Sequence, residues 1–363
     1  MTFNNKLLGV CVSVVAAAAC VSAHAASKGV TVSITPDKRV LKADDDVVVH
    51  VTVTNTSSTP QYVLKHHAPL GGEEMEEALF EVYRDGARVD YLGAHYKRPA
   101  PKANDYYVLQ PGKSHKFKLE LSAFYDMSVT GNYSISYNTK SYNLFSSSFD
   151  GNGVAKAESQ QGVLKSEAVS IWIDGRLPQG TVTTAKATDP LPTAGGLSFS
   201  RCTSSQQNTI VNAMSAATNM ATDSDAYLQA NKTGSRYTTW FGTYTSSRYS
   251  TVKSHFVAIK DAFLNKPVTV DCGCNKTYYA YVYPTQPYKI YVCKAFWSAP
   301  MTGTDSKGGT LVHEMSHFNV VAGTDDHVYG QSGAKSLAIS DPNRAVENAD
   351  SHEYFAENTP ALN

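Results

Sequence analysis

The sequence has no excess of charge of either sign and no N-terminal apolar segment long enough to cross a membrane. Lys and Arg together number 32, as do Asp and Glu, so the formal net charge is zero. This balance gives no electrostatic basis for binding nucleic acid or an anionic membrane. The apolar run of residues 7–19 is too short to span a bilayer as a stable helix. We therefore expect neither a nucleic-acid partner nor a membrane span.

The short apolar run instead has the features of a secretory signal peptide. Lys6 supplies the positive charge before it, and Ala23-His24-Ala25 is a small-x-small cleavage site. We predict a signal peptide over residues 1–25 and a secreted, extracellular protein. A lipoprotein anchored at Cys20 is the alternative, because residues 17–20 loosely resemble a lipobox that lacks its usual leucine.

Cysteine is absent between residues 26 and 201, and four cysteines follow: Cys202, Cys272, Cys274 and Cys293. An even number in an exported chain predicts two disulfides. Cys272 and Cys274 are separated by one residue and rarely meet the geometry of a bridge, so each is expected to pair elsewhere. Two pairings remain, 202–272 with 274–293 or 202–274 with 272–293. The C-x-C spacing is poor for a cysteine zinc site.

Residues 26–175 have the two-residue period of half-buried strands. Turn signals such as Asp85-Gly86 and Pro111-Gly112 separate the strands. The alternating apolar positions are Val49, Val51 and Val53; Phe117, Leu119 and Leu121; Tyr133, Ile135 and Tyr137; and Val169, Ile171 and Ile173. Several short strands over this length predict an all-β sandwich of immunoglobulin-like type.

Residues 176–197 are rich in Pro, Gly, Thr and Ala and are typical of a linker exposed to proteolysis. Beyond it, residues 198–363 are predicted to form a mainly helical domain of zincin type with a small sheet, so the predicted fold class is α+β. We predict helices over residues 204–231, 246–264 and 342–357, and a hairpin over 278–292. A further helix is expected to begin after Gly308-Gly309 and to end at Gly323.

That last helix carries the pattern H-E-x-x-H at His313, Glu314 and His317. Histidines four positions apart lie on one face of a helix, so both rings can reach one metal ion. The intervening Glu314 can then address a water molecule beside the metal. The pattern predicts a zinc hydrolase, and the alternative is a solvent-facing helix with two unrelated histidines.

A catalytic zinc needs a third protein ligand. The metzincin arrangement would place a histidine at position 323, which is Gly323, and is therefore excluded. A thermolysin-like arrangement would use a glutamate from a later helix, with three candidates: Glu347, Glu353 and Glu357. A third solution lies directly after the helix, where Gly323 lets the chain turn back and Asp326 can offer its carboxylate.

The run Gly323-Thr-Asp-Asp326-His-Val-Tyr329-Gly330 after H-E-x-x-H resembles the signature of the deuterolysin-type zinc endopeptidases, the aspzincins. The resemblance covers roughly residues 200–363. It is closest to the peptidyl-Lys metalloendopeptidase branch through residues 236–242, 295–297 and 348–355. It implies one zinc ion per chain held by His313, His317 and Asp326, with Tyr329 stabilising the oxyanion. Asp325 and His327 remain alternative ligands, and the family's disulfide pattern is 202–272 with 274–293.

Asp350 and Glu353 are three positions apart in a predicted helix and share a face. Such pairs commonly form a solvated acidic face, but the resemblance implies that they line the pocket for the residue after the cut. Two carboxylates favour lysine over the bulkier guanidinium of arginine. We predict a zinc endopeptidase that cleaves before lysine, with Glu314 as general base. The alternatives are a broad-specificity deuterolysin-like protease and a non-enzymatic β-rich surface-binding protein with a structural zinc.

The N-terminal domain is expected to be a propeptide that inhibits the enzyme within the same, monomeric chain. Because residues 26–201 lack cysteine, a thiolate cannot block the zinc, and a segment must cover the site instead. Lys186 lies in the linker, so the enzyme could cut between Ala185 and Lys186, with trimming towards Ser198. The alternative is a permanent β-sandwich that binds a surface or a substrate.

Overall fold

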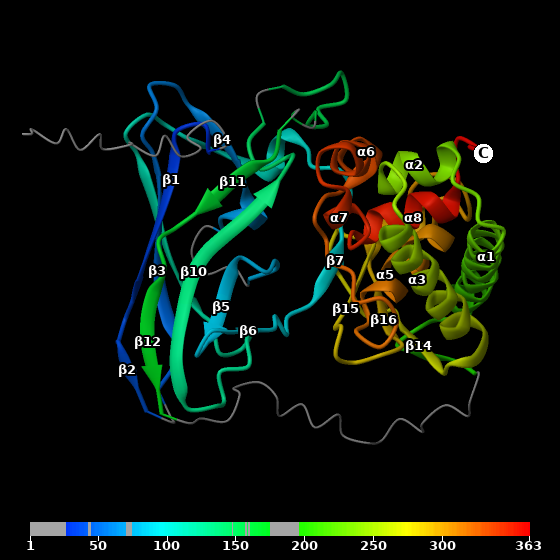
Figure 1. Ribbon diagram of the computed structural model, residues 1–363, viewed down its shortest axis with the longest axis horizontal. Coiled ribbons are helices and arrows are strands. Elements are labelled where there is room, and N and C mark those ends of the chain that lie inside the picture. Colours follow the sequence, from blue (N-terminus) through cyan, green and yellow to red (C-terminus); the bar gives the residue numbers. More distant parts are fainter. Residues whose placement is uncertain are drawn as a thin grey trace, which may run out of the picture.

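The computed structural model describes residues 27–42, 45–69, 75–146, 148–156, 158, 160–174 and 196–363. The predicted signal peptide, Cys20 and the bond between Ala185 and Lys186 lie outside these residues. A β-rich N-terminal part, residues 27–174, lies beside a helical C-terminal part, residues 196–363 (Figure 1). This agrees with the predicted α+β class. None of the described helices is long and apolar enough to cross a membrane.

Three largely antiparallel sheets make up most of the N-terminal part. The first has the order β1 (Val30–Pro36), β3 (Val48–Asn55), β9 (Ser114–Glu120). The second has the order β2 (Val40–Leu41), β12 (Val169–Ile173), β10 (Gly131–Ser141), β5 (Phe80–Arg84), β6 (Ala87–Val89), and β11 (Gly162–Lys165) also pairs with β10. The third joins β4 (Gln61–Leu64) to β8 (Tyr106–Leu109).

The core of this part is built by alternation along the strands. On β3, Val49, Val51 and Val53 are fully buried, while the intervening side chains are exposed or half-buried. The predicted two-residue period is therefore present. The immunoglobulin-like type and the domain boundaries remain predictions.

A five-stranded sheet lies in the C-terminal part, but one of its strands comes from the N-terminal part. Its order is β13 (Leu197–Ser200), β14 (Val268–Asp271), β16 (Lys289–Val292), β15 (Ala280–Val282), β7 (His95–Lys97). Figure 1 shows β7 leaving the β-rich part to lie against this sheet. The predicted hairpin is the antiparallel pair of β15 and β16.

The helices of the C-terminal part lie beside this sheet, and α5 packs against it. They are α1 (Ser204–Gln229), α2 (Ser235–Phe241), α3 (Ser246–Asn265), α4 (Lys294–Ser298), α5 (Lys307–His317), α6 (Gly330–Ser340), α7 (Pro342–Ala345) and α8 (Ala349–Glu357). The predicted limits of α1 and α3 agree with the structure to within two residues. Thr203 caps α1 by accepting a hydrogen bond from the backbone of Gln206.

The predicted limits of the H-E-x-x-H helix were wrong at both ends. The helix α5 begins at Lys307 and contains both glycines, because the Ser306 side chain caps its first turn by accepting a hydrogen bond from the Gly309 backbone amide. It ends at His317, since Phe318 adopts an extended backbone. Gly323 does have a positive φ of 59°, but in the turn that follows the helix.

The predicted last helix is divided into α7 and α8. Asn348 separates them with an extended backbone, and its side-chain oxygen accepts hydrogen bonds from the backbone amides of His327 and Val328. The break therefore anchors the loop between α5 and α6.

The disulfides are Cys202–Cys272 and Cys274–Cys293, the pairing implied by the family resemblance. The first joins the chain before α1 to the end of β14, and the second joins the following loop to the end of β16. Both disulfides therefore fix the ends of β14 and β16 in the five-stranded sheet.

Candidate metal centre

Two imidazoles face one another on the buried helix α5. His313 and His317 are fully buried, and their Nε2 atoms lie 3.1 Å apart. The one-turn spacing of the two residues produces this arrangement. The structure thus brings together the two histidines that the sequence singles out.

Asp326 completes a three-residue set with these histidines. After α5 the chain turns at Gly323, and Asp326 Oδ1 lies 3.1 Å from His313 Nε2 and 3.4 Å from His317 Nε2. Ligand atoms around a tetrahedral zinc lie about 3.3 Å apart, given bond lengths of about 2.0–2.1 Å. Burial raises the pKa of Asp326, but the two imidazoles outweigh it and hold the pKa well below its usual range. The donor set therefore fits a zinc ion in both spacing and chemistry.

The other ring nitrogen of each histidine lies close to an oxygen atom. His313 Nδ1 lies 2.9 Å from Asp350 Oδ1 and 3.3 Å from Glu353 Oε2, and His317 Nδ1 lies 2.7 Å from the carbonyl oxygen of Thr324. Acceptors at Nδ1 leave each Nε2 directed at the metal position, as in many zinc sites.

The alternative third ligands lie elsewhere. Glu347 is largely exposed and its carboxylate is 3.9 Å from His327, while Glu357 accepts hydrogen bonds from the backbone and hydroxyl of Ser306. The side chain of Asp325 is half exposed. The remaining candidate, Glu353, lies on the Nδ1 side of His313 and not beside its metal-facing nitrogen.

Glu314 lies beside this set on the same helix. It is fully buried, and neither carboxylate oxygen has a hydrogen-bond partner among the described residues. Burial raises its pKa to about 7, opposed by the charges of His313 and His317. The nearby backbone amide of Lys97 also lowers this pKa. Glu314 is thus a carboxyl group able to exchange a proton near neutral pH.

Asp350 and Glu353 are fully buried on α8, so they do not form a solvated acidic face. Lys97 of the N-terminal part pairs with both, at 3.1 Å from Asp350 Oδ1 and 2.7 Å from Glu353 Oε2. These carboxylates raise the pKa of the Lys97 ammonium well above its usual range, against the effect of burial. We call this cluster the lysine site.

The lysine site contains further residues that the sequence did not identify as partners of a lysine. Asp305 Oδ1 lies 3.3 Å from Lys97 Nζ and accepts a hydrogen bond of 2.7 Å from the Tyr354 hydroxyl. The ammonium also lies over the rings of Tyr354 and Tyr279, 5.3 and 5.6 Å from their centroids. The ammonium therefore donates hydrogen bonds to Asp305 and Asp350 and forms an ion pair with Glu353.

The strand β7 that carries Lys97 pairs antiparallel with β15, in the register His95–Val282, Tyr96–Tyr281 and Lys97–Ala280. The Tyr329 hydroxyl donates a hydrogen bond of 2.8 Å to the carbonyl oxygen of Tyr96. The peptide bond that precedes Lys97 thus lies between Tyr329 and the lysine site.

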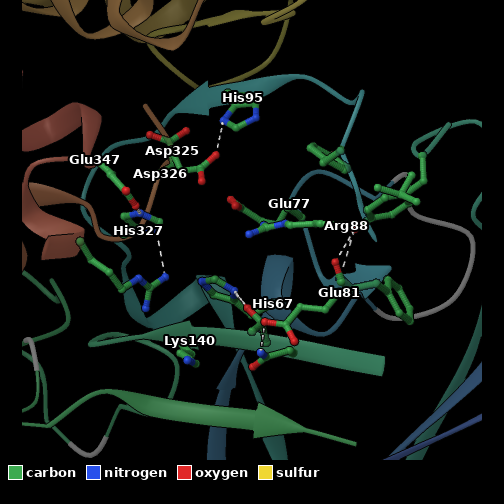
Figure 2. Close-up of a pocket in the computed structure, with 18 of the residues that line it drawn as sticks. His67, Glu77, Glu81, Arg88, His95, Lys140, Asp325, Asp326, His327 and Glu347 are labelled. Carbon is green, nitrogen blue, oxygen red and sulfur yellow. Dashed lines mark hydrogen bonds and ion pairs between the residues drawn. The ribbon is translucent and has the colours of Figure 1, made fainter. Parts of the chain in front are cut away.

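A cavity of about 270 Å³ lies next to the metal centre and is lined by residues of both parts. Figure 2 shows His95 projecting towards Asp325 and Asp326 at one side of this cavity, with Glu77 of the N-terminal part facing them. The His95 and His317 rings have centroids 4.8 Å apart. The N-terminal part therefore contacts the metal centre itself as well as the lysine site.

Comparison with known proteins finds one protein family and several proteases that resemble this chain. The aspzincin family, described as lysine-specific metallo-endopeptidase, matches residues 226–357. An extracellular protease of Aeromonas hydrophila is 48% identical over 88% of this chain and 90% of its own. A peptidyl-Lys metalloendopeptidase of Armillaria mellea is 37% identical over 94% of this chain and 96% of its own. A solved zinc peptidase from Grifola frondosa is 50% identical, with a TM-score of 0.43, over 45% of this chain and 100% of its own. This chain belongs to the aspzincin family of zinc metalloendopeptidases.

Proposed function

We propose that this chain is the secreted zymogen of an endopeptidase that hydrolyses the bond on the N-terminal side of lysine. One observation carries the proposal. Lys97 is paired with the buried Asp350 and Glu353 while Tyr329 donates a hydrogen bond to the carbonyl oxygen just before that lysine. The Tyr96–Lys97 bond thus has the position of a scissile bond. The Armillaria mellea relative is named as a peptidyl-Lys metalloendopeptidase, which supports the same specificity.

His313, His317 and Asp326 would hold one zinc ion per chain. When bound, the ion supplies a Lewis acid that polarises the scissile carbonyl and lowers the pKa of a water molecule. Glu314 accepts the proton of the attacking water and later donates it to the leaving amine. Its raised pKa, about 7, suits both transfers near neutral pH.

Tyr329 stabilises the negative charge that develops on the carbonyl oxygen. Its hydroxyl lies 2.8 Å from the corresponding oxygen of Tyr96. A donor already aimed at this oxygen needs no reorganisation as the charge forms.

Lysine is selected by two carboxylates without solvent exposure. Buried carboxylates that lack a cation are costly, so a neutral side chain in the lysine site would leave them uncompensated. The compact ammonium can donate to both, whereas the planar guanidinium of arginine is bulkier. We therefore expect arginine to be accepted poorly.

The N-terminal part is a propeptide, a β-sandwich of immunoglobulin-like type over residues 26–175 that follows a signal peptide over residues 1–25. It keeps the enzyme latent because β7 occupies the edge of β15 and Lys97 fills the lysine site. Arg98 braces the strand through ion pairs of 3.1 Å with Glu76 and Glu77. Activation requires this part to be separated within the linker of residues 176–197.

The test is mass spectrometry of a denatured protein digested by the matured enzyme, with a Glu314→Ala variant as the control. We expect cuts clustered before lysine and none in the control. Cuts scattered over other residues would leave a zinc protease of the broad deuterolysin-like type. Absence of cuts by the wild-type enzyme would contradict the proposed function altogether.

A second measurement assigns the specificity to the two carboxylates. The double variant Asp350→Asn with Glu353→Gln keeps the shape of the lysine site but removes its charge. Breaking a buried ion pair costs about 3–5 kcal/mol, so kcat/KM for lysine peptides should fall at least about 100-fold. Because both carboxylates also lie beside His313, the zinc content of the double variant is measured as a control. Retained preference for lysine in a zinc-loaded double variant would return the pair to a structural role.

A further inference from the structure

The residue before Lys97 occupies an aromatic site on the C-terminal part. The ring of Tyr96 lies 5.2 Å from the ring of Tyr281 and 5.4 Å from the ring of Tyr278, between centroids. Lys276 Nζ lies 4.9 Å from the same ring centroid. The Tyr96 side chain is buried by these contacts and by Arg98, which directly follows β7.

The register of the sheet builds this aromatic site. Tyr281 on β15 is the cross-strand partner of Tyr96 on β7 and of Tyr291 on β16. The rings of Tyr281 and Tyr291 stack in parallel, with centroids 4.5 Å apart and an interplanar angle of 2°. Side chains directly opposite one another on a sheet face contact each other. Because Tyr291 supports Tyr281 from within the C-terminal part, this aromatic face does not depend on β7.

We infer that Tyr278 and Tyr281 form the subsite for the residue before the cut, so the enzyme prefers bonds in which an aromatic residue precedes lysine. This inference rests on the proposed function, since it takes β7 to lie as a substrate lies. An aromatic side chain in the subsite gains ring–ring contacts and the cation–π contact with Lys276. Glycine in the same position leaves both tyrosine rings uncovered. The substrates favoured are therefore protein segments containing Tyr-Lys or Phe-Lys.

The experiment compares peptides that are identical except for the residue before a single lysine, either Tyr or Gly, with the matured enzyme. We expect kcat/KM to be at least about tenfold higher for the Tyr-Lys peptide, the scale on which apolar subsites discriminate. In the Tyr278→Ala, Tyr281→Ala double variant this ratio should approach one. The Tyr281→Phe variant is the matched control, because it keeps the ring and should keep the ratio. Because the ratio compares two peptides cut by the same enzyme preparation, a general loss of active enzyme does not change it.

Each other outcome has a defined meaning. Equal kcat/KM for Tyr-Lys and Gly-Lys peptides with the wild-type enzyme would overturn the inference and leave the proposed lysine specificity intact. A high ratio that persists in the double variant would also overturn it, because the preference would then arise elsewhere. If neither peptide is cut before lysine, the proposed function itself fails.

Discussion

Asp325 and Asp326 are neighbours in the sequence but lie in different surroundings. The side chain of Asp326 is 4% exposed and faces both imidazoles, whereas that of Asp325 is 52% exposed. The backbone of Asp325 bridges to the chain before α8, through hydrogen bonds with Glu347 and Ala349. The side chain of Asp325 is thereby held away from the Nε2 atoms of His313 and His317, although Asp325 directly precedes the proposed ligand in the sequence.

Replacing each aspartate in turn tests the ligand assignment. The Asp326→Ala variant of the full chain should bind zinc far more weakly. Loss of an outer-shell partner lowers metal affinity by about 10–100-fold, and we expect the loss of affinity here to be larger. Asp325→Ala is the matched control and should retain zinc. Zinc content and competition with a chromogenic chelator give the readout. Loss of zinc from the Asp325 variant alone would make that residue the ligand.

Local spacing was enough to predict that His313 and His317 face one another, because one turn of helix separates them. Asp326 was one of several candidate third ligands until the family resemblance selected it, and Tyr329 came from the resemblance alone, since a turn of irregular backbone separates both from α5. Lys97 could not be predicted, because its partner Asp350 is 253 positions away in the sequence. Nothing in the residues around Lys97 marks it as different from an exposed lysine.

At the scale of elements, α1 and α3 were predicted from the sequence, whereas β7 was missed. A helix of 20 residues repeats its apolar period several times, but β7 has three residues and no period of its own. Its pairing partner, β15, comes from another part of the chain. Such a strand exists because of tertiary contacts and leaves little signal in its own sequence. The end of α5 was missed for a related reason, since Phe318 leaves the helix to join the core.

The strand β7 should be the element that keeps the intact chain inactive. The Lys97→Ala variant leaves Asp350 and Glu353 without their cation, so β7 should be held less firmly and the uncut chain should cleave an added lysine peptide. The measurement is peptide hydrolysis by full-length protein, with intact mass showing that the chain is uncut. Lys118→Ala, on the exposed side of β9, is the matched control and should stay latent. A latent Lys97→Ala variant would mean that other contacts block the site.

At the scale of the whole molecule, the two parts share one sheet and the lysine site, and they contact each other beside the candidate metal centre. The connection between them, residues 175–195, lies outside the described residues, so the Ala185–Lys186 cleavage remains a proposal. The relatives from Aeromonas hydrophila and Armillaria mellea align over 90% and 96% of their own lengths, so both parts have counterparts there.

Self-processing of the whole chain can be checked directly. Wild-type protein secreted from a host without other proteases should yield a fragment that begins at Lys186, followed by trimming towards Ser198. The Glu314→Ala protein, produced in the same way, should stay intact. N-terminal sequencing of the products gives the readout, and a Glu314→Ala chain cut at the same bond would assign the cleavage to another enzyme.

Strand β7 lies well before the linker in the sequence, so a cut in the linker does not itself remove it from the enzyme. Severing the linker turns an intramolecular equilibrium into an ordinary bimolecular one. If β7 keeps the chain latent as proposed, the freed N-terminal part becomes a diffusible inhibitor whose occupancy of the site follows mass action. At high protein concentration the cut enzyme would therefore stay mostly inactive. Dilution, or degradation of the N-terminal part, would release the activity.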